Sequence, residues 1–348
     1  MTTYPSLHRT PESGTDAAGR VIVIGSSVMD VVGRPYAALL EGSSIPGQVR
    51  MSPGGVARNV AENLARLGID VSLITAVGDD PAGRQLIEDA AGAGIDVSHA
   101  LSVVGARTGV YLAMLTPQGG LHMALDDMGV VQALTPEYLD SRRTVLDEAQ
   151  AIFLDSNVPV ESLSAIIQGA RLAGVAVAAD PTTVPLAANL RPHLRDLWLV
   201  TPSEAEAEVL SPHPVPPTDR DSLQDPLRDA PSGVRSATKR DAKRNRAVDA
   251  ARHLVAEGVD IALVTMAEFG VGYATAETSG HVPAVQTEVL DPTGAGDAQT
   301  AAVLFGLLNG IPLDESVRLG ISAAALTLRT PGSVVANLSL EMLYDELR

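Results

Sequence analysis

One stretch near the end of this sequence places an aspartate after two glycines and before a long apolar run, an arrangement in which chemistry is expected. In DPTGAGDAQTAAVLFGLL (residues 291–308), Gly294 and Gly296 precede Asp297 at the start of a predicted helix. Asp297 could be an ordinary N-cap, whose carboxylate accepts hydrogen bonds from the free N–H groups of the first turn. Glycines at this spacing instead allow successive backbone N–H groups to point at one spot, an anion-binding nest that the positive end of the helix reinforces. These residues by themselves leave both interpretations open.

A second candidate site lies in SPGGVARN (52–59). Gly54 and Gly55 would let a ligand approach the backbone closely, and Asn59 stands one turn into the following predicted helix. The alternative is a tight turn followed by a first-turn amide. Asp30 follows the first predicted strand in IGSSVMD. That segment lacks the later glycines of the dinucleotide fingerprint G-x-G-x-x-G, which argues against a dehydrogenase.

Further polar residues follow other predicted strands, namely Asp155, Asn157, Asp180, Ser203 and Glu206. Ligands of open parallel sheets bind beyond the carboxyl ends of the strands, so these side chains would gather along one edge. Each one taken singly is more often a loop residue or a helix cap. The sequence contains no Walker A motif, HExxH, GxSxG or spaced histidine cluster, and therefore gives no support to a metallohydrolase or a serine hydrolase.

The elements that must position these residues alternate along the chain. Short Val-, Ile- and Leu-rich runs predict buried strands, and segments of helical period lie between them, several ending at glycine. This order predicts a parallel sheet covered by helices on both faces. The predicted strands are 21–25, 71–78, 151–157, 175–181, 197–202 and 261–266, and the predicted helices are 58–68, 83–94, 161–174 and 248–258.

Two regions interrupt the alternation. Residues 31–52 and about 105–125, the latter a hairpin around PQGG, predict a small second sheet that could act as a flap; an edge extension of the main sheet is the alternative. Residues 211–246 are rich in Pro, Asp, Arg and Ser and predict a long, mobile surface insertion, with a basic docking site as the alternative. Residues 1–19 predict a disordered leader.

Composition limits the classes of partner. The chain has 348 residues, a net charge of −17 and no cysteine, so polymeric nucleic acid, anionic membranes and thiolate chemistry are not expected. It has no signal peptide and no apolar run long enough for a membrane span, which predicts a cytoplasmic protein.

Several segments of the sequence, taken together, match one family pattern. GGVARNVAENLARLG (54–68) and DPTGAGDAQTA (291–301) resemble, in the same order, the two signature segments of the ribokinase-like, or PfkB, carbohydrate kinases. GSSVMD, AVGDDPAG (76–83), TPSEAE (201–206) and VTMAEFG (264–270) resemble the family as well, so the likeness covers roughly residues 20 to 345. It implies a three-layer α/β/α domain over residues 20–348, with a mainly parallel central sheet and a small β-sheet lid.

The resemblance also implies a role for each motif. Asp297 matches the family's catalytic base, which takes the proton of the substrate hydroxyl, and Gly294, Ala295 and Gly296 match its anion hole. This favours the nest over the cap. Asp30, Gly55 and Asn59 match residues that grip sugar hydroxyls, with Gly54 beside them.

The remaining implied roles concern ATP and the metal ions. Ser203 and Glu206 stand where the family has an N-x-x-E motif that helps to organise Mg²⁺ and phosphate. Thr265 and Gly270 belong to the region that covers the nucleotide, and Asp291 matches a place that holds K⁺ in many members. The chain departs from the family pattern at Ser203, where the motif has asparagine, and at Ala267, where many members have glycine.

A narrower resemblance, to the pseudouridine kinases of bacteria, rests on SPGGVARNVAENLARLG, LDDMGVVQALTPEYL (125–139) and FLDSN (153–157). It implies ATP- and Mg²⁺-dependent phosphorylation of the 5′-hydroxyl of pseudouridine, with Asp127 or Asn157 as the acceptor for the extra ring N–H. A kinase of ribose, another nucleoside or a sugar acid is the alternative within the family. A catalytically silent ligand-binding regulator is the alternative outside it, although retention of Asp297 argues against that. Lid strands of this family often pair between subunits, so a homodimer is expected.

Overall fold

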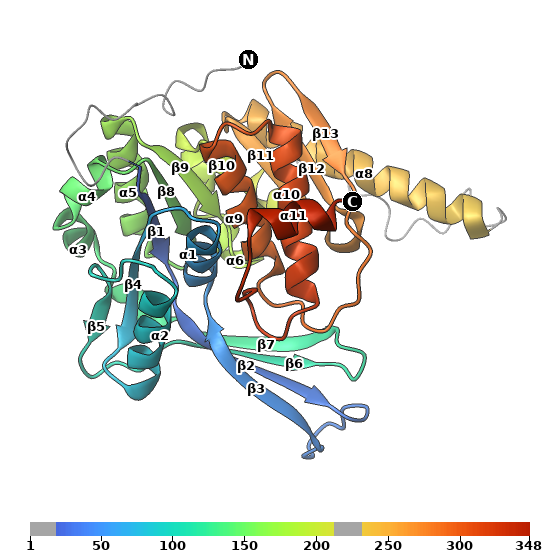
Figure 1. Cartoon of the computed structure of the whole chain (residues 1–348), viewed down its shortest axis with the longest axis horizontal. Helices are drawn as coiled ribbons and strands as arrows, with labels where there is room; N and C mark the ends of the chain where they lie inside the picture. Colours follow the sequence, from blue (N-terminus) through green and yellow to red (C-terminus); the bar gives the residue numbers. More distant parts are fainter. Residues whose placement is uncertain (1–18, 212–231) are drawn as a thin grey trace.

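The computed structural model of the chain describes residues 19–211 and 232–348 (Figure 1). Residues 1–18 of the predicted leader and residues 212–231 of the predicted insertion lie outside the described residues. Within the described part, the fold has a large sheet between two layers of helices and a small second sheet at one side (Figure 1).

The large sheet contains nine strands in the order β13-β12-β11-β10-β9-β8-β1-β4-β5. The strands from β11 to β5 are parallel, and β12 and β13 add an antiparallel edge. This confirms the predicted mainly parallel sheet. The strands are β1 (Val21–Gly25), β4 (Val71–Gly78), β5 (Leu101–Val103), β8 (Ala151–Asp155), β9 (Ala176–Asp180), β10 (Leu199–Val200), β11 (Ile261–Thr265), β12 (Val271–Thr275) and β13 (Ser279–Val282).

The sheet has a separate hydrophobic core on each face because successive side chains of a strand point to opposite sides. On β1, Val21 and Val23 belong to one core, and Ile22 and Ile24 to the other. The first core is covered by helices α1, α9 and α10, and the second by α5, α7 and α8. The helices are α1 (Val56–Arg66), α2 (Pro81–Gly92), α3 (Pro136–Asp140), α4 (Arg143–Asp147), α5 (Val160–Ala173), α6 (Val184–Ala187), α7 (Glu204–Leu210), α8 (Ser232–Ala256), α9 (Ala295–Leu308), α10 (Leu313–Leu328) and α11 (Leu340–Glu346), with 3₁₀ turns η1 (Gly129–Ala133), η2 (Arg191–Asp196) and η3 (Ala267–Phe269).

The small sheet, called the lid sheet below, has the strand order β3-β2-β6-β7 and extends along one side of the molecule (Figure 1). Its central pair β2–β6 is parallel and its outer pairs are antiparallel. The hairpin predicted around PQGG is confirmed, closed by Thr116 and Gly120. The strands are β2 (Val28–Pro35), β3 (Gly47–Gly54), β6 (Val110–Leu115) and β7 (Leu121–Asp127).

Helix α8 corrects one boundary. The sequence predicts a helix from 248 and an unstructured insertion before it, whereas α8 begins at Ser232 and projects from the body of the molecule (Figure 1). The segment 234–247 has neither glycine nor proline and is rich in Ala, Lys and Arg, which favour helix even without an apolar stripe. The apolar stripe begins at Ala247, which lies against Gly272 of β12.

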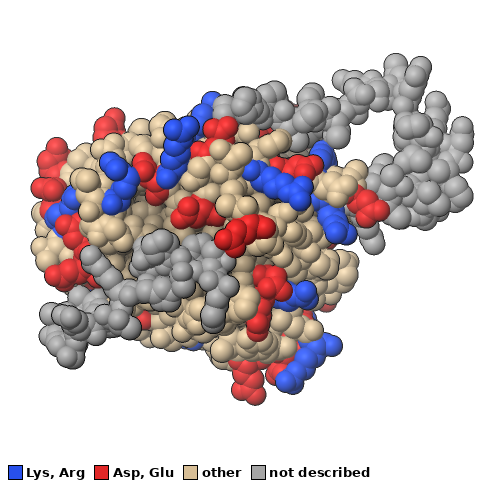
Figure 2. All heavy atoms as spheres, turned by 90° about the horizontal axis from the view of Figure 1, so that it is seen from above, with Lys and Arg blue, Asp and Glu red and all other residues tan. Residues whose placement is uncertain are grey.

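Among the described residues no helix is both long and apolar enough to span a bilayer. On the face shown in Figure 2, the visible Lys and Arg side chains are interspersed with Asp and Glu.

Candidate active site

A cavity of about 390 Å³ opens where the carboxyl ends of the central strands meet the lid sheet. Its volume lies in the range of small-molecule sites. Six residues that the sequence predicts for the site line it together: Asp30, Gly55, Asn59, Asn157, Gly294 and Asp297. Chain segments far apart in sequence therefore converge at one place.

Asp297 lies in the first turn of α9, yet it is not a cap. The N-cap position is Gly294, and no side chain caps this helix. The Asp297 carboxylate instead accepts a hydrogen bond of 2.8 Å from the side-chain amide of Asn59. The first turn of a helix has N–H groups without intrahelical partners, so the start of α9 can receive an anion. The geometry thus supports the nest and leaves the carboxylate free for chemistry.

The glycines before Asp297 have different structural reasons. Gly294 has a φ of +78°, and a Cβ there would lie 2.2 Å from the carbonyl oxygen of Ser333. A Cβ on Gly296 would meet no atom within 4 Å. Gly294 is therefore required by the close approach of the 330–333 loop, whereas Gly296 faces open space at the start of the helix.

Asn59 is held by a hydrogen-bond network on its other side. Its Oδ1 accepts from the Ser333 hydroxyl at 3.0 Å and from the Arg58 guanidinium at 3.1 Å. Arg58 is itself buried and forms an ion pair with Glu62. These donors fix the orientation of the Asn59 amide, so its NH₂ group points at Asp297.

Asp155 organises the beginning of α1, a role that the sequence does not reveal. Its buried carboxylate accepts from the Ser26 N–H (2.8 Å), the Ser26 hydroxyl (2.6 Å) and the Ala57 N–H (3.1 Å). A Cβ on Gly25 would lie 2.4 Å from this carboxylate. Because Asp155 and Ser26 satisfy the first turn of α1, that helix end differs from the uncapped start of α9.

Asp30 is buried in β2, and burial raises its pKa to about 7, with Asp297 and Asp291 adding to the increase and Arg58 and Arg50 opposing it. Gly54 makes room for it, because a Cβ there would lie 2.2 Å from the Asp30 carboxyl group. Gly54 does not line the cavity, so it acts through Asp30.

The charge at the base of the cavity is concentrated in carboxyl groups. The pKa of Asp297 is raised to about 6, chiefly by burial. The hydrogen bond from Asn59 lowers this pKa, and the charge of Asp155 raises it. Burial also raises the pKa of Asp180 well above its ordinary value, and the charges of Asp297 and Glu206 raise it further. Asp297 remains ionised at neutral pH, as a proton acceptor requires.

The backbone at Thr182 is strained. This cavity-lining residue has a φ of +66°, which is a rare conformation for a β-branched side chain. Hydrogen bonds hold it there: its N–H donates to Asp180 at 2.7 Å, and its hydroxyl accepts from the Ser156 N–H at 3.0 Å.

The residues predicted to organise nucleotide and Mg²⁺ lie at the same edge of the sheet but outside the cavity. Ser203 and Glu206 form a reciprocal capping box at the start of α7, with the Ser203 N–H donating to Glu206 at 2.7 Å. Thr265 ends β11, and its N–H bonds to the Pro202 carbonyl at 2.9 Å. Gly270 has a φ of +97° in the following turn, and Ala267 has a φ of +46°.

The lid sheet contributes a residue that the sequence does not single out. Asp126 lines the cavity and pairs with Tyr111 on β6, which lines it too. Both residues are exposed, but the predicted Asp127 does not line the cavity, and its carboxylate accepts from the Gly129 N–H at 3.3 Å. Adjacent residues of a strand point to opposite faces, and one position decides which of them faces the site.

Asp291 also lies outside the cavity lining. It is buried at the start of the DPTGAGD turn, where it forms an ion pair with Arg50 of β3.

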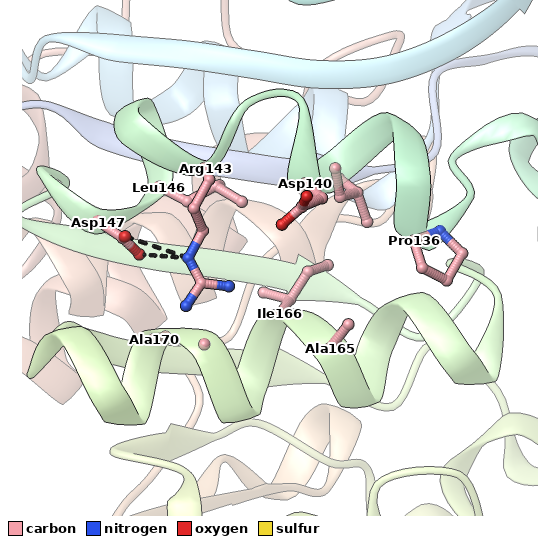
Figure 3. A pocket seen from close by; sticks show the side chains of 10 residues that line it. Pro136, Asp140, Arg143, Leu146, Asp147, Ala165, Ile166 and Ala170 are labelled. Atoms are coloured by element: carbon pink, nitrogen blue, oxygen red, sulfur yellow. Dashed lines mark hydrogen bonds and ion pairs between the residues drawn. The ribbon is translucent and has the colours of Figure 1, made fainter.

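A second, much smaller hollow of about 40 Å³ lies between α3, α4 and α5 (Figure 3). Arg143 crosses it and pairs with Asp147 at 2.9 Å. Its volume suits one or two water molecules rather than a nucleoside.

Comparison with known proteins agrees with this geometry. The family model described as pfkB family carbohydrate kinase matches residues 18–339. The chain belongs to this family. It is 31% identical to the pseudouridine kinase of Escherichia coli (strain K12), over 88% of this chain and 90% of that protein.

Two solved structures share the fold. A ribokinase of Arabidopsis thaliana, complexed with ribose and ATP, gives a TM-score of 0.76 at 20% identity and covers 95% of this chain and 99% of its own. An E. coli protein assigned as a ribokinase II, solved with ATP and Mg²⁺, gives a TM-score of 0.74 at 19% identity, with 94% and 99% covered. The chain is thus a kinase of the pfkB family with a ribokinase-like fold, which confirms the resemblance seen in its motifs.

Proposed function

We propose that this kinase transfers the γ-phosphoryl group of ATP to the 5′-hydroxyl of pseudouridine. The observation that carries the proposal is the position of Asp297, whose carboxylate lies beside the uncapped start of α9 and opens into a cavity of about 390 Å³. The likeness to the E. coli pseudouridine kinase supports the choice of acceptor.

In the proposed reaction the acceptor oxygen forms a bond to the γ-phosphorus as the bond from that phosphorus to the bridging oxygen of ATP breaks. The hydroxyl proton passes to Asp297, and the products are the 5′-phosphate ester and ADP. Free N–H groups at the start of α9 would stabilise charge on the transferred group. Asn59 orients Asp297 toward the acceptor through its 2.8 Å hydrogen bond.

The residues present fit ATP with Mg²⁺. The described residues contain no cluster of three or more His, Cys, Asp or Glu side chains able to hold a metal by themselves. Mg²⁺ that is bound mainly by ATP phosphates needs one or two carboxylates at most, and it neutralises phosphate charge when bound. We assign Glu206 to this indirect role, because its charge acts on the Asp180 carboxyl beside the site.

Recognition of the base is assigned to the lid sheet. Pseudouridine carries a ring N–H where uridine has its glycosidic nitrogen, so a pocket that selects it needs an acceptor there. Asp126 supplies a carboxylate on the cavity wall, and the apolar side chains of Val28, Leu115 and Met128 line the same cavity. Where the bound base shields the Asp126 carboxylate from water, uridine would leave that acceptor unpaired, at a penalty of about 1–3 kcal/mol.

Asn157 is the second candidate for the base. It lines the cavity, and its amide donates to the Ser26 hydroxyl at 3.3 Å. Asn59, which donates to Asp297, and Asp30, whose pKa the Asp297 charge raises, are assigned to the ribose hydroxyls.

Two other functions are the alternatives to this one. Ribose as the acceptor has the support of the fold likeness to a ribokinase complexed with ribose and ATP. A silent regulator would bind ligand without consuming ATP.

The deciding experiment compares kcat/KM for pseudouridine, uridine and ribose. We expect pseudouridine to be preferred over uridine by up to roughly 10⁴-fold. Asp126→Ala removes the acceptor and should lose that preference while keeping ribose-directed binding, and Asp127→Ala, on the outer face of the same strand, serves as the matched control. A preference for uridine or ribose would overturn the pseudouridine assignment. If none of the three compounds supports ATP consumption, another acceptor is favoured.

We also propose that two copies of the chain associate through the lid sheet. Val49, Met51, Met123 and Leu125 are exposed on β3 and β7, on the side of the sheet away from the cavity. An exposed apolar sheet face is typical of a protein contact.

A further inference from the structure

Asp291 joins three segments around the anion-binding turn. Its Oδ1 accepts from the Thr293 N–H at 3.0 Å, which shapes the turn that leads to Gly294. Its Oδ2 accepts from the Gly332 N–H at 3.4 Å and from the guanidinium of Arg50. The 330–333 loop, the turn before α9 and the lid sheet therefore meet at one buried carboxylate.

Arg50 reaches this carboxylate from the inner face of the lid sheet. On β3, Arg50 pairs with Val32 and Ser52 pairs with Asp30, so Arg50 and Ser52 share the face that carries Asp30. Their neighbours on the strand, Val49 and Met51, point outward and are exposed. An ion pair between residues 241 positions apart thus ties the lid sheet to the phosphoryl-binding turn.

The charge of Arg50 has a direct consequence for that turn. An unpaired negative charge at Asp291 would oppose the negative charge of a phosphoryl group bound at the start of α9. Burial disfavours the ionised form of Asp291, but the hydrogen bonds from Thr293 and the pairing with Arg50 hold its pKa below the ordinary value. Arg50 supplies the positive charge that balances this ionised carboxylate.

The donor set does not suit the K⁺ that the family resemblance implies at Asp291. Both oxygens of the carboxylate already accept hydrogen bonds from N–H groups. A monovalent cation at the same carboxylate would lie beside the guanidinium, and the two positive charges would repel each other.

We propose that Arg50 is a positioning residue for phosphoryl transfer, which holds the lid sheet to the anion-binding turn and replaces a monovalent cation at Asp291. Activity then does not depend on K⁺. The inference rests on the kinase activity of the proposed function but not on pseudouridine as the acceptor.

The test compares K⁺, Na⁺ and choline as the sole monovalent cation at fixed ionic strength, with ATP, Mg²⁺ and the best acceptor of the substrate comparison. We expect the unmodified chain to have rates within about twofold in the three salts. Arg50→Gln should lower kcat in choline by roughly 10- to 100-fold, the scale of a small misplacement of the reacting groups. K⁺ should restore part of this loss, and Arg50→Lys should retain most of the activity.

Arg34→Gln is the matched control. Arg34 lies on β2 of the same sheet, and its guanidinium donates to the Pro117 carbonyl at 3.0 Å, far along the hairpin from Asp291. This variant removes the same charge from the same sheet and should keep kcat within about twofold.

A second readout needs no acceptor, and it separates failure of this inference from failure of the proposed function. Without substrates, K⁺ should raise the Tm of Arg50→Gln above its value in choline, because a cation that binds the folded state stabilises it. The unmodified chain should show no such difference. Stimulation of the unmodified chain by K⁺ of more than fivefold, full activity of Arg50→Gln in choline, or a loss equally deep in K⁺ and choline would each overturn the proposal.

Discussion

Asp297 has to satisfy two opposing demands at the scale of a single residue. Burial raises its pKa to about 6, whereas a proton acceptor must be ionised when the substrate binds. The Asn59 amide favours the ionised form by donating at 2.8 Å. The balance leaves the carboxylate charged above pH 6 and still basic enough to take a proton.

Replacement of Asp297 by Asn should therefore abolish proton acceptance but preserve the fold. We expect kcat to fall by roughly 10²-fold or more, with a much smaller change in ATP affinity. In the unmodified chain, kcat/KM should decline as the pH falls through about 6, the pKa of Asp297, because protonation removes the proton acceptor. Steady-state kinetics from pH 5 to 9 measure both effects, and near-normal turnover of a folded Asp297→Asn variant would contradict the assignment.

The ionised carboxylate of Asp30 should lower the free energy of unfolding at the pH at which the enzyme works. Its pKa is raised from 3.8 to about 7 in the folded chain, so its stabilising effect is complete below pH 4 and is lost as the pH rises through 7. Asp30→Asn should accordingly raise the free energy of unfolding at pH 8 by up to about 4 kcal/mol and lower kcat/KM. Denaturant unfolding at pH 8 and pH 4 gives the measurement: the gain should vanish at the lower pH, and a gain of equal size at both would contradict the ionisation argument.

At the scale of the elements, β3 places Gly54 directly against the side chain of Asp30 on β2. A Cβ there would lie 2.2 Å from the carboxyl group of Asp30. The pairing of the two strands thus determines whether Asp30 can occupy the cavity wall.

Gly54→Ala should displace the Asp30 side chain and lower kcat/KM for the acceptor by roughly 10²-fold, as a misplacement near the reacting groups does. Gly92→Ala is the control, because a Cβ on Gly92, in α2, would meet no atom within 4 Å. Kinetics of the two variants, each with its Tm, would separate a local from a global effect. An unchanged kcat/KM in Gly54→Ala would show that Asp30 can move without loss.

At the scale of the whole molecule, the lid sheet has two faces with different roles. The inner face carries Asp30, Arg50 and Tyr111 toward the active site. The outer face exposes apolar side chains, with Met51 at 65% and Leu125 at 69% of their full exposure. Because one sheet serves both, association of two copies would also restrict the motion of the lid.

Met51→Lys combined with Leu125→Lys should convert a dimer to a monomer, because each charge would be buried in the contact. Leu172→Lys is the control, since Leu172 is 74% exposed on α5, away from the lid sheet. Sedimentation equilibrium distinguishes the two states. A chain that is monomeric before substitution, or a dimer that survives both charges, would contradict the lid contact.

The sequence by itself determined the elements whose signals are local. Apolar runs predicted six of the nine strands of the large sheet, and helical periods predicted α1, α2, α5, α9 and the second half of α8, because each pattern repeats within ten to fifteen residues. DPTGAGD indicated either an N-cap or an anion site, through glycines that lie next to the helix they serve, and the likeness to the kinase family favoured the anion site. Where a local pattern was weak, as in the polar first half of α8, the prediction was wrong.

The tertiary structure decided which distant side chains meet. Asn59 orients Asp297, Asp155 completes the first turn of α1, and Arg50 pairs with Asp291, each across a sequence gap that no periodicity spans. The choice between Asp126 and Asp127 depended on strand pairing, since a shift of one residue exchanges the two faces of a strand. Local propensity acts along the chain, whereas these contacts depend on the order and register in which the strands pack, and only the folded molecule contains that information.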